Sequence, residues 1–131
     1  MQFFLPMYPP TCTAQQHRVV ARGKGKPAAF FDSPALADAR AKLTANLAQH
    51  RPDTPLNGPI RLTVKWCFPA TGKHKDGDWK VTKPDTDNLQ KLLKDVMTRA
   101  GFWVDDARVC SEIVEKFWAD VPGIWIRIET L

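Results

Sequence analysis

The sequence predicts a small α+β domain in which two main helices pack on a mixed β-sheet. A chain of 131 residues has the usual length of one domain, and 44% apolar with 25% charged residues is a globular composition. Strand-like and helix-like segments follow one another in the order strand, helix, strand, helix, strand, strand, which is typical of an α+β fold. No repeat or linker interrupts this order, so residues 1–131 are expected to form one domain.

The first half of the chain contains two strand-like segments and one helix-like segment. Residues 2–5 form a short apolar run that ends at a proline, as a strand does. Ser33 followed by Pro34 is a good N-cap and first helical residue, and the Ala/Leu-rich helix that follows ends before Pro52. Residues 59–69 alternate between apolar and polar side chains, which predicts a half-buried strand.

The second half predicts a helix and two strands. An apolar stripe at helical spacing runs through residues 87–100, and Gly101 has the position of a helix-ending glycine. Residues 109–118 and 123–130 alternate as strands, joined by a turn near Pro122.

The chain is basic, with a formal charge of +5 and a pI near 9.3. This balance favours a polyanionic partner, nucleic acid before an acidic membrane, although a merely soluble basic protein has the same charge. The basic side chains gather in a glycine-broken stretch over residues 11–30 and in a long loop over residues 69–84 around Trp79. Either stretch is a solvated loop or a DNA-contacting one. The candidate DNA-binding residues are Arg18, Arg22, Lys24, Lys26, Lys73, Lys75, Lys80 and Lys83.

Several classes of protein are disfavoured by the sequence. Cys12, Cys67 and Cys110 are odd in number and far apart, which favours reduced thiols over a disulfide framework or a zinc site. The N-terminus lacks a basic segment and meets proline at once, unlike a signal peptide. No apolar run approaches the ~18 residues of a membrane span. A soluble cytoplasmic protein without a membrane partner is therefore expected.

Two aspartates, Asp85 and Asp87, lie at the start of the second helix. An aspartate there accepts hydrogen bonds from free backbone N–H groups and complements the helix dipole. Asp87 with Gln90 three residues later even resembles a capping box. One cap needs only one acid, however, so a second role is open for this pair.

A second acidic pair, Asp105 and Asp106, follows the same helix. The helix from residue 87 to 100 advances about 20 Å, and an extended chain from 101 to 106 covers a similar length. If Gly101 reverses the chain, the second pair returns level with the first. Gathered carboxylates repel unless a cation offsets them, and oxygen-only ligands suit Mg²⁺ or Mn²⁺. The alternative is an acidic pair that merely occupies a turn.

Asp87, Lys91 and Asp95 are spaced four residues apart and share one helix face. They form either an ordinary surface ion-pair ladder, or a site in which the Lys91 ammonium meets the charge of a phosphate beside the acids. Spacing alone does not decide between the two.

The segment KPDTDNLQKLLKDVMTRAGFWVDDARV, residues 83–109, closely resembles the signature of the RusA-like Holliday junction resolvases. The matching elements are the Asp-x-Asp-Asn-Leu-Gln-Lys run from Asp85 to Lys91, then Asp95, the Ala-Gly-Phe-Trp segment and the Asp-Asp-Ala triplet. The similarity is dense over about 27 residues and weaker elsewhere, although the length and the order of elements fit the whole chain.

This resemblance implies a RusA-like fold and a homodimer, from phage or bacteria, that cuts four-way DNA junctions in recombination and repair. It also implies catalysis by Asp85, Asp87, Lys91 and Asp106. Asp85, Asp87 and Asp106 would bind Mg²⁺ or Mn²⁺, with Asp105 beside them as a further metal candidate. Three alternatives stay open: a metal nuclease that acts on other branched or duplex DNA, a binding module that recognises branched DNA without cutting it, and a structural protein with a stabilising ion.

Overall fold

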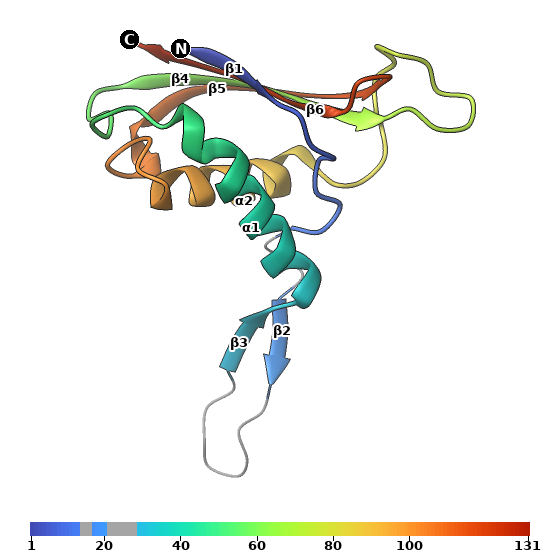
Figure 1. The fold of residues 1–131 in the computed structure, drawn as a ribbon, viewed down its shortest axis with the longest axis horizontal. Coiled ribbons are helices and arrows are strands. Elements are labelled where there is room, and N and C mark those ends of the chain that lie inside the picture. The colour runs from blue at the N-terminus through green and yellow to red at the C-terminus, as the bar shows by residue number, and fades with distance from the viewer. Residues whose placement is uncertain (14–16, 21–28) are drawn as a thin grey trace.

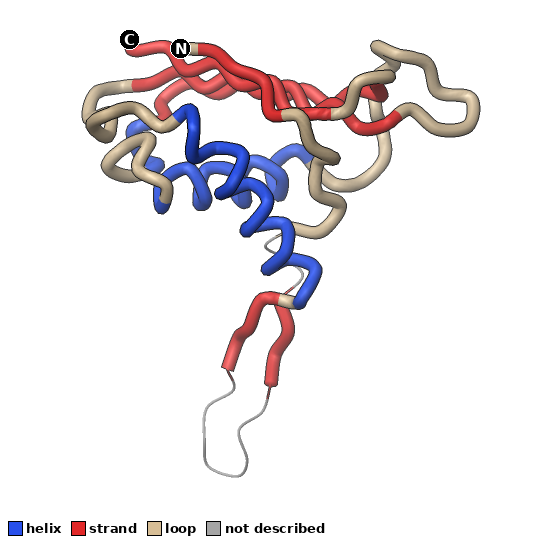
Figure 2. The backbone as a smooth tube through the Cα atoms, viewed as in Figure 1, coloured by secondary structure: helices blue, strands red, loops and turns tan. Residues whose placement is uncertain are grey.

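Two helices cover one face of a four-stranded sheet in the computed structural model, which describes residues 1–13, 17–20 and 29–131 (Figure 1). The elements in chain order are β1 (Gln2–Leu5), β2 (His17–Val20), β3 (Ala29–Asp32), α1 (Pro34–Leu47), η1 (Ala48–His50), β4 (Ile60–Pro69), α2 (Thr86–Arg99), η2 (Asp106–Arg108), β5 (Val109–Ala119) and β6 (Gly123–Thr130). The expected α+β class is confirmed, and the layers are plain in Figure 2.

The sheet is mixed, with strand order β1-β6-β4-β5. β4 pairs with β6 in the antiparallel sense and with β5 in the parallel sense. Parallel neighbours require a crossover connection, and α2 is the helix in that crossover. The helix therefore begins near the carboxyl ends of β4 and β5 and ends near the start of β5.

The core lies between the sheet and the helices. Alternate residues of β4, from Ile60 to Phe68, are buried on the helix side. The stripe predicted for α2 is also buried, and it contributes Leu89, Leu92, Leu93, Val96 and Met97. α1 begins as predicted, because the Ser33 hydroxyl accepts a hydrogen bond of 3.1 Å from the Leu36 N–H and Pro34 occupies the first turn.

The hairpin formed by β2 and β3 was not predicted. The stretch expected to be a loop contains an antiparallel hairpin, in which β2 pairs with β3 so that His17 faces Asp32 and Val20 faces Ala29. Figure 1 shows this hairpin at the N-terminal end of α1, away from the four-stranded sheet. The β-branched and aromatic residues of HRVV and AFFD favour strands, and the basic, glycine-rich residues between them obscured that pattern.

Cys12, Cys67 and Cys110 are all free thiols. Among the described residues, no helix combines the length and the apolar character that crossing a membrane requires.

Candidate active site

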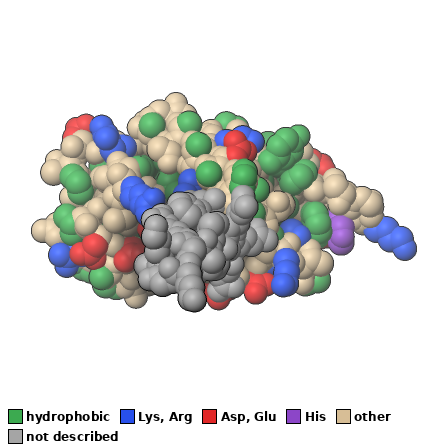
Figure 3. All heavy atoms as spheres, turned by 90° about the horizontal axis from the view of Figure 1, so that it is seen from below, with side chains coloured by type: hydrophobic (Ala, Val, Ile, Leu, Met, Phe, Trp, Pro, Cys, Tyr) green, Lys and Arg blue, Asp and Glu red, His purple; other side chains and the backbone are tan. Residues whose placement is uncertain are grey.

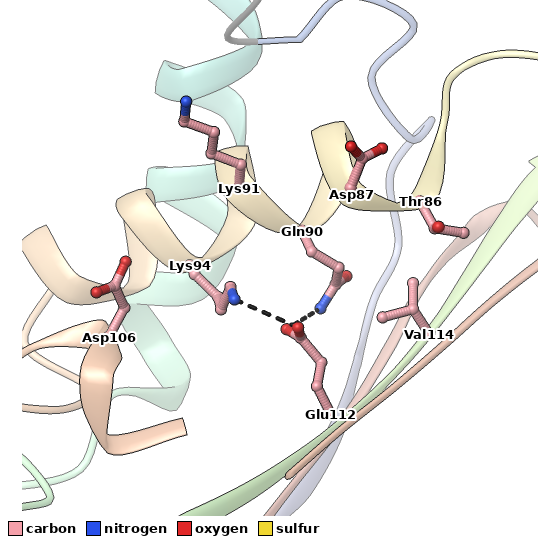
Figure 4. A pocket seen from close by; sticks show the side chains of 8 residues that line it. All are labelled: Thr86, Asp87, Gln90, Lys91, Lys94, Asp106, Glu112 and Val114. Carbon is pink, nitrogen blue, oxygen red and sulfur yellow. Dashed lines mark hydrogen bonds and ion pairs between the residues drawn. The ribbon is translucent and has the colours of Figure 1, made fainter. Parts of the chain in front are cut away.

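A pocket of about 350 Å³ lies between α2, η2 and the first half of β5 (Figure 4). All but one of its lining residues are polar: Thr86, Asp87, Gln90, Lys91, Lys94, Asp106, Glu112 and Val114. The pocket thus brings together Asp87, Lys91 and Asp106, three of the four residues expected to be catalytic. The fourth, Asp85, lies immediately before α2 and outside the lining set.

The first acidic pair does not cap α2 in the usual way. Asp85 is the N-cap residue, and its backbone carbonyl accepts a hydrogen bond of 3.1 Å from the Leu89 N–H. Its side chain makes no capping hydrogen bond. Asp87 lies inside the first turn, so it is not the N-cap that the capping-box pattern suggested. Both carboxylates are exposed and are not used to start the helix.

Gln90, the supposed partner in the capping box, belongs instead to a buried network. Its side chain is 2% exposed, and its carbonyl oxygen accepts a hydrogen bond of 2.8 Å from Trp66 Nε1. Its amide nitrogen donates to a Glu112 carboxylate oxygen at 2.9 Å. Lys94 Nζ lies 3.3 Å from the other oxygen of Glu112, and Figure 4 shows both side chains pointing at that carboxylate. This network fixes the wall of the pocket between α2 and β5.

Glu112 was missed by sequence reasoning, although a signal for it exists. It pairs in register with Leu62, whose side chain is buried on the helix side of the sheet. An acid at an inward position of a strand needs a polar partner, and this is the pattern that marks a polar site. Lys116 occupies another inward position of β5, in register with the buried Trp66.

The chain reversal predicted at Gly101 is confirmed. Gly101 has φ of 89°, a left-handed conformation that glycine adopts without steric cost. The Gly101 N–H bonds to the carbonyl of Thr98 at 3.1 Å, and the Phe102 N–H bonds to that of Met97 at 3.0 Å. This is the Schellman pattern, and it ends α2.

The chain after Gly101 does not extend as expected, which corrects the predicted meeting of three or four of these carboxylates. Residues 102–104 pair with Leu56, and residues 106–108 form the turn η2, so the extended strand starts only at Val109. Figure 4 shows Asp106 and Asp87 at opposite ends of the pocket. The residue that returns level with the helix start is Lys116, which bonds to Pro84.

Asp105 is engaged in that turn. It is the N-cap residue of η2, and its Oδ1 accepts a hydrogen bond of 2.8 Å from the Ala107 N–H. Of the second acidic pair, only Asp106 lines the pocket.

Lys91 is exposed and forms no ion pair among the described residues, so the interpretation as a surface ladder is not supported. The third member of the supposed ladder, Asp95, pairs instead with Arg40 of α1 at 2.8 Å and with Arg99 at 3.7 Å. The Lys91 ammonium therefore remains available at the pocket.

The donors of the pocket match a hard cation in type, since Asp87, Asp106 and Glu112 offer only carboxylate oxygens. Their arrangement is wider than a bound ion needs. Within residues 1–13, 17–20 and 29–131, no three acidic, histidine or cysteine side chains are grouped closely enough to hold a metal. An ion would therefore have to draw the carboxylates together.

Apart from Lys80, the basic residues predicted to contact DNA divide into three groups. Lys73, Lys75 and Lys83 are exposed in the loop between β4 and α2. Figure 3 shows basic and histidine side chains at the right-hand end of the molecule, where this loop projects in Figure 1. Arg18 lies in β2. The remaining candidates lie outside the described residues: Arg22, Lys24 and Lys26.

Lys80 departs from the expectation of an exposed phosphate contact. It is 8% exposed, and its Nζ lies over the ring of Trp118, 4.4 Å from the centroid. Burial lowers the pKa of its ammonium group, and the positive charge of Lys116 lowers that pKa further. Trp79 lies beside it, packed against Phe117 with ring centroids 4.6 Å apart and ring planes tilted by 30°, and is still 62% exposed.

Comparisons with known proteins identify the family to which the chain is similar. The family model described as "Endodeoxyribonuclease RusA" matches residues 8–129. A crossover junction endodeoxyribonuclease of Lactococcus phage r1t is 31% identical over 99 residues, which cover 74% of this chain and 73% of the relative. The protein of that name from Escherichia coli K12 is 28% identical over 100 residues, covering 76% and 72%. One from Shigella sonnei is 56% identical over 64 residues, covering 49% and 45%.

Proposed function

Because the chain belongs to the RusA family of endodeoxyribonucleases, we propose that it resolves Holliday junctions by metal-dependent hydrolysis of two opposed strands. The observation that carries the proposal is the pocket that Asp87, Lys91 and Asp106 all line. The proposed setting is the cytoplasm of a bacterial or phage-infected cell, where the protein acts on DNA in recombination and repair.

Asp85, Asp87 and Asp106 are the proposed ligands of Mg²⁺, with Mn²⁺ as the alternative ion. When bound, such an ion supplies an activated water and neutralises charge that develops on the phosphate. Asp105 neighbours these acids and holds the η2 turn that presents Asp106. Without a cation, the acidic side chains repel the DNA backbone, so the metal also favours productive binding.

Lys91 is the proposed catalytic cation. It lies one helical turn after Asp87, lines the same pocket and has no carboxylate partner in the described parts of the chain. An ammonium group there stabilises negative charge on the phosphate under attack.

The exposed lysines of the loop between β4 and α2, together with the basic residues of the hairpin region, are the proposed contacts to DNA phosphates. Such contacts position the junction and make binding fall steeply with salt, but they read no sequence. A four-way junction offers two equivalent strands, so a two-fold homodimer is the proposed acting form. Sedimentation of the free protein and of its junction complex measures that stoichiometry.

The deciding experiment incubates the purified protein with a labelled four-way junction, a fork and a linear duplex, with Mg²⁺, with Mn²⁺ and with a chelator. The proposal expects paired nicks in the junction that require the metal and stop with the chelator. Equal cutting of all three substrates would instead identify a nuclease of broader specificity. Tight junction binding without cutting under any of these conditions would identify a binding module.

A further inference from the structure

Residues 82–84, which precede Asp85 and α2, belong to no strand or helix. Two lysine side chains hold them, one from the neighbouring strand β5 and one from the loop itself. Lys116, at an inward position of β5, donates from Nζ to the carbonyl of Thr82 at 2.6 Å and to that of Pro84 at 2.7 Å. Ammonium-to-carbonyl bonds of this kind are stronger than those between neutral groups.

Lys80 completes the arrangement from within the loop. Its Nζ donates to the carbonyl of Lys83 at 2.8 Å and to the hydroxyl of Thr82. Two ammonium groups thus bind three successive backbone carbonyls, those of residues 82, 83 and 84, immediately before Asp85.

The two lysines are themselves anchored on the sheet. The Lys80 N–H bonds to the carbonyl of Lys116 at 3.1 Å, which joins the loop to the outer edge of β5. The Lys80 ammonium also lies 5.1 Å from the centroid of Phe68, in addition to its place over Trp118. Phe68 and Trp118 are paired residues of β4 and β5, so the rings form a rigid floor beneath the ammonium.

Keeping these two cations together costs free energy. No carboxylate pairs with either ammonium in the described parts of the chain, and two like charges repel each other. The bonds to the three carbonyls offset that cost only while residues 82–84 keep their present path. The lysines therefore select one backbone conformation for this segment.

That conformation matters because, within the described parts of the chain, no hydrogen bond or ion pair holds the Asp85 side chain. Its carboxylate forms no capping bond, so its direction follows from the backbone that enters α2. We infer that Lys80 and Lys116 are positioning residues, which hold the backbone before Asp85 so that the carboxylates of Asp85 and Asp87 point at the scissile phosphate. The assignment depends on the proposed nuclease activity, although the clamp itself can be measured without it.

The first test compares K80M and K116M with the wild type. Methionine keeps the length and apolar stem of lysine but removes the donor. K42M is the matched control, since Lys42 is an exposed lysine of α1 that pairs with Asp38. At saturating protein, the single-turnover rate of junction cleavage should fall about 10- to 100-fold in K80M and K116M. The junction Kd should change less than about threefold, and K116R should recover much of the rate because it keeps charge and donors.

The second test follows amide hydrogen exchange in the free protein at residues 89–92, which begin with the Leu89 N–H bonded to the Asp85 carbonyl. Exchange should be faster in both methionine variants than in the wild type and K42M, because the start of α2 is released. If the wild type cuts no branched DNA, the proposed function fails while faster exchange still supports the clamp.

Two results would overturn the inference. One is cleavage at the wild-type rate together with unchanged exchange in both variants. The other is a weakened junction Kd that accounts for the whole loss of activity, since the lysines would then be DNA contacts. If K80M does not fold, K116M carries the test, because it leaves Lys80 in place.

Discussion

Asp85 and Asp105 stand at equivalent points of the two acidic turns, each in the residue before a helix, yet their carboxylates are used differently. Asp105 caps η2 through the Ala107 N–H, whereas the Asp85 side chain caps nothing. The backbone before Asp85 is instead held by two lysines from outside the turn. In the first case the carboxylate is already engaged in a hydrogen bond that stabilises its own turn. In the second case lysine side chains stabilise the backbone, so the carboxylate is left available for chemistry.

The second acid of each turn, Asp87 or Asp106, is used in the same way in both turns. Asp87 and Asp106 line one pocket from opposite ends, and neither is used to cap a helix. Lys91 and the network from Gln90 to Glu112 lie between them. The two turns are therefore similar in their second acid and different in their first.

The largest expected effect is the loss of cleavage when a carboxylate proposed to bind metal is neutralised. D87N and D106N, with D85N as the third, should each lower the single-turnover rate at least about 100-fold, because even neighbours of metal ligands contribute 10- to 100-fold. Junction affinity should be retained or increased, since a negative charge near the DNA is removed. Filter binding and cleavage at saturating protein measure the two quantities. A variant that cuts at the parental rate removes that acid from the site.

A smaller effect is expected for the cation between the two turns. K91A should slow the chemical step about 10- to 100-fold without loss of junction binding, because Lys91 meets charge that develops on the phosphate. K91R should restore part of the rate, as it keeps the charge. Single-turnover kinetics at saturating protein separate this result from a binding defect. Weaker binding with an unchanged chemical step would make Lys91 a DNA contact only.

The smallest expected effects are on stability, where the two first acids should differ in the opposite sense to their effects on cleavage. D105A loses a capping bond and should lower the free energy of unfolding by about 1 kcal/mol, while its cleavage rate falls much less than that of D85A. D85A loses only the helix-dipole interaction, worth a few tenths of a kcal/mol, but should abolish cleavage. Urea unfolding measures the free energy of unfolding, and the junction assay measures the cleavage rate. Equal stability losses in the two variants would contradict the difference in capping.

Local sequence was sufficient for the helices and the reversal. The apolar stripe of α2, the Ser33 cap and the glycine after Ala100 each depend on residues about one helical turn apart in the sequence. All three were predicted. The hairpin of β2 and β3 was missed, because glycine and basic residues between the strands weakened the pattern. The position of Asp106 was also misjudged, because an extended path was assumed from residue 101 to 106, where residues 102–104 instead pair with Leu56.

The sequence by itself determined which residues are available for chemistry: a dense set of aspartates and one lysine on a helix and on the turn that follows it, in a basic chain. Only the tertiary structure decided which of these side chains meet. The parallel pairing of β4 with β5 runs β5 back along α2, and this places Glu112 beside Gln90 and Lys116 beside Pro84. Those contacts join residues 22 and 32 positions apart. Spacing along one strand or one helix carries no information about them, since they depend on how the two elements are aligned.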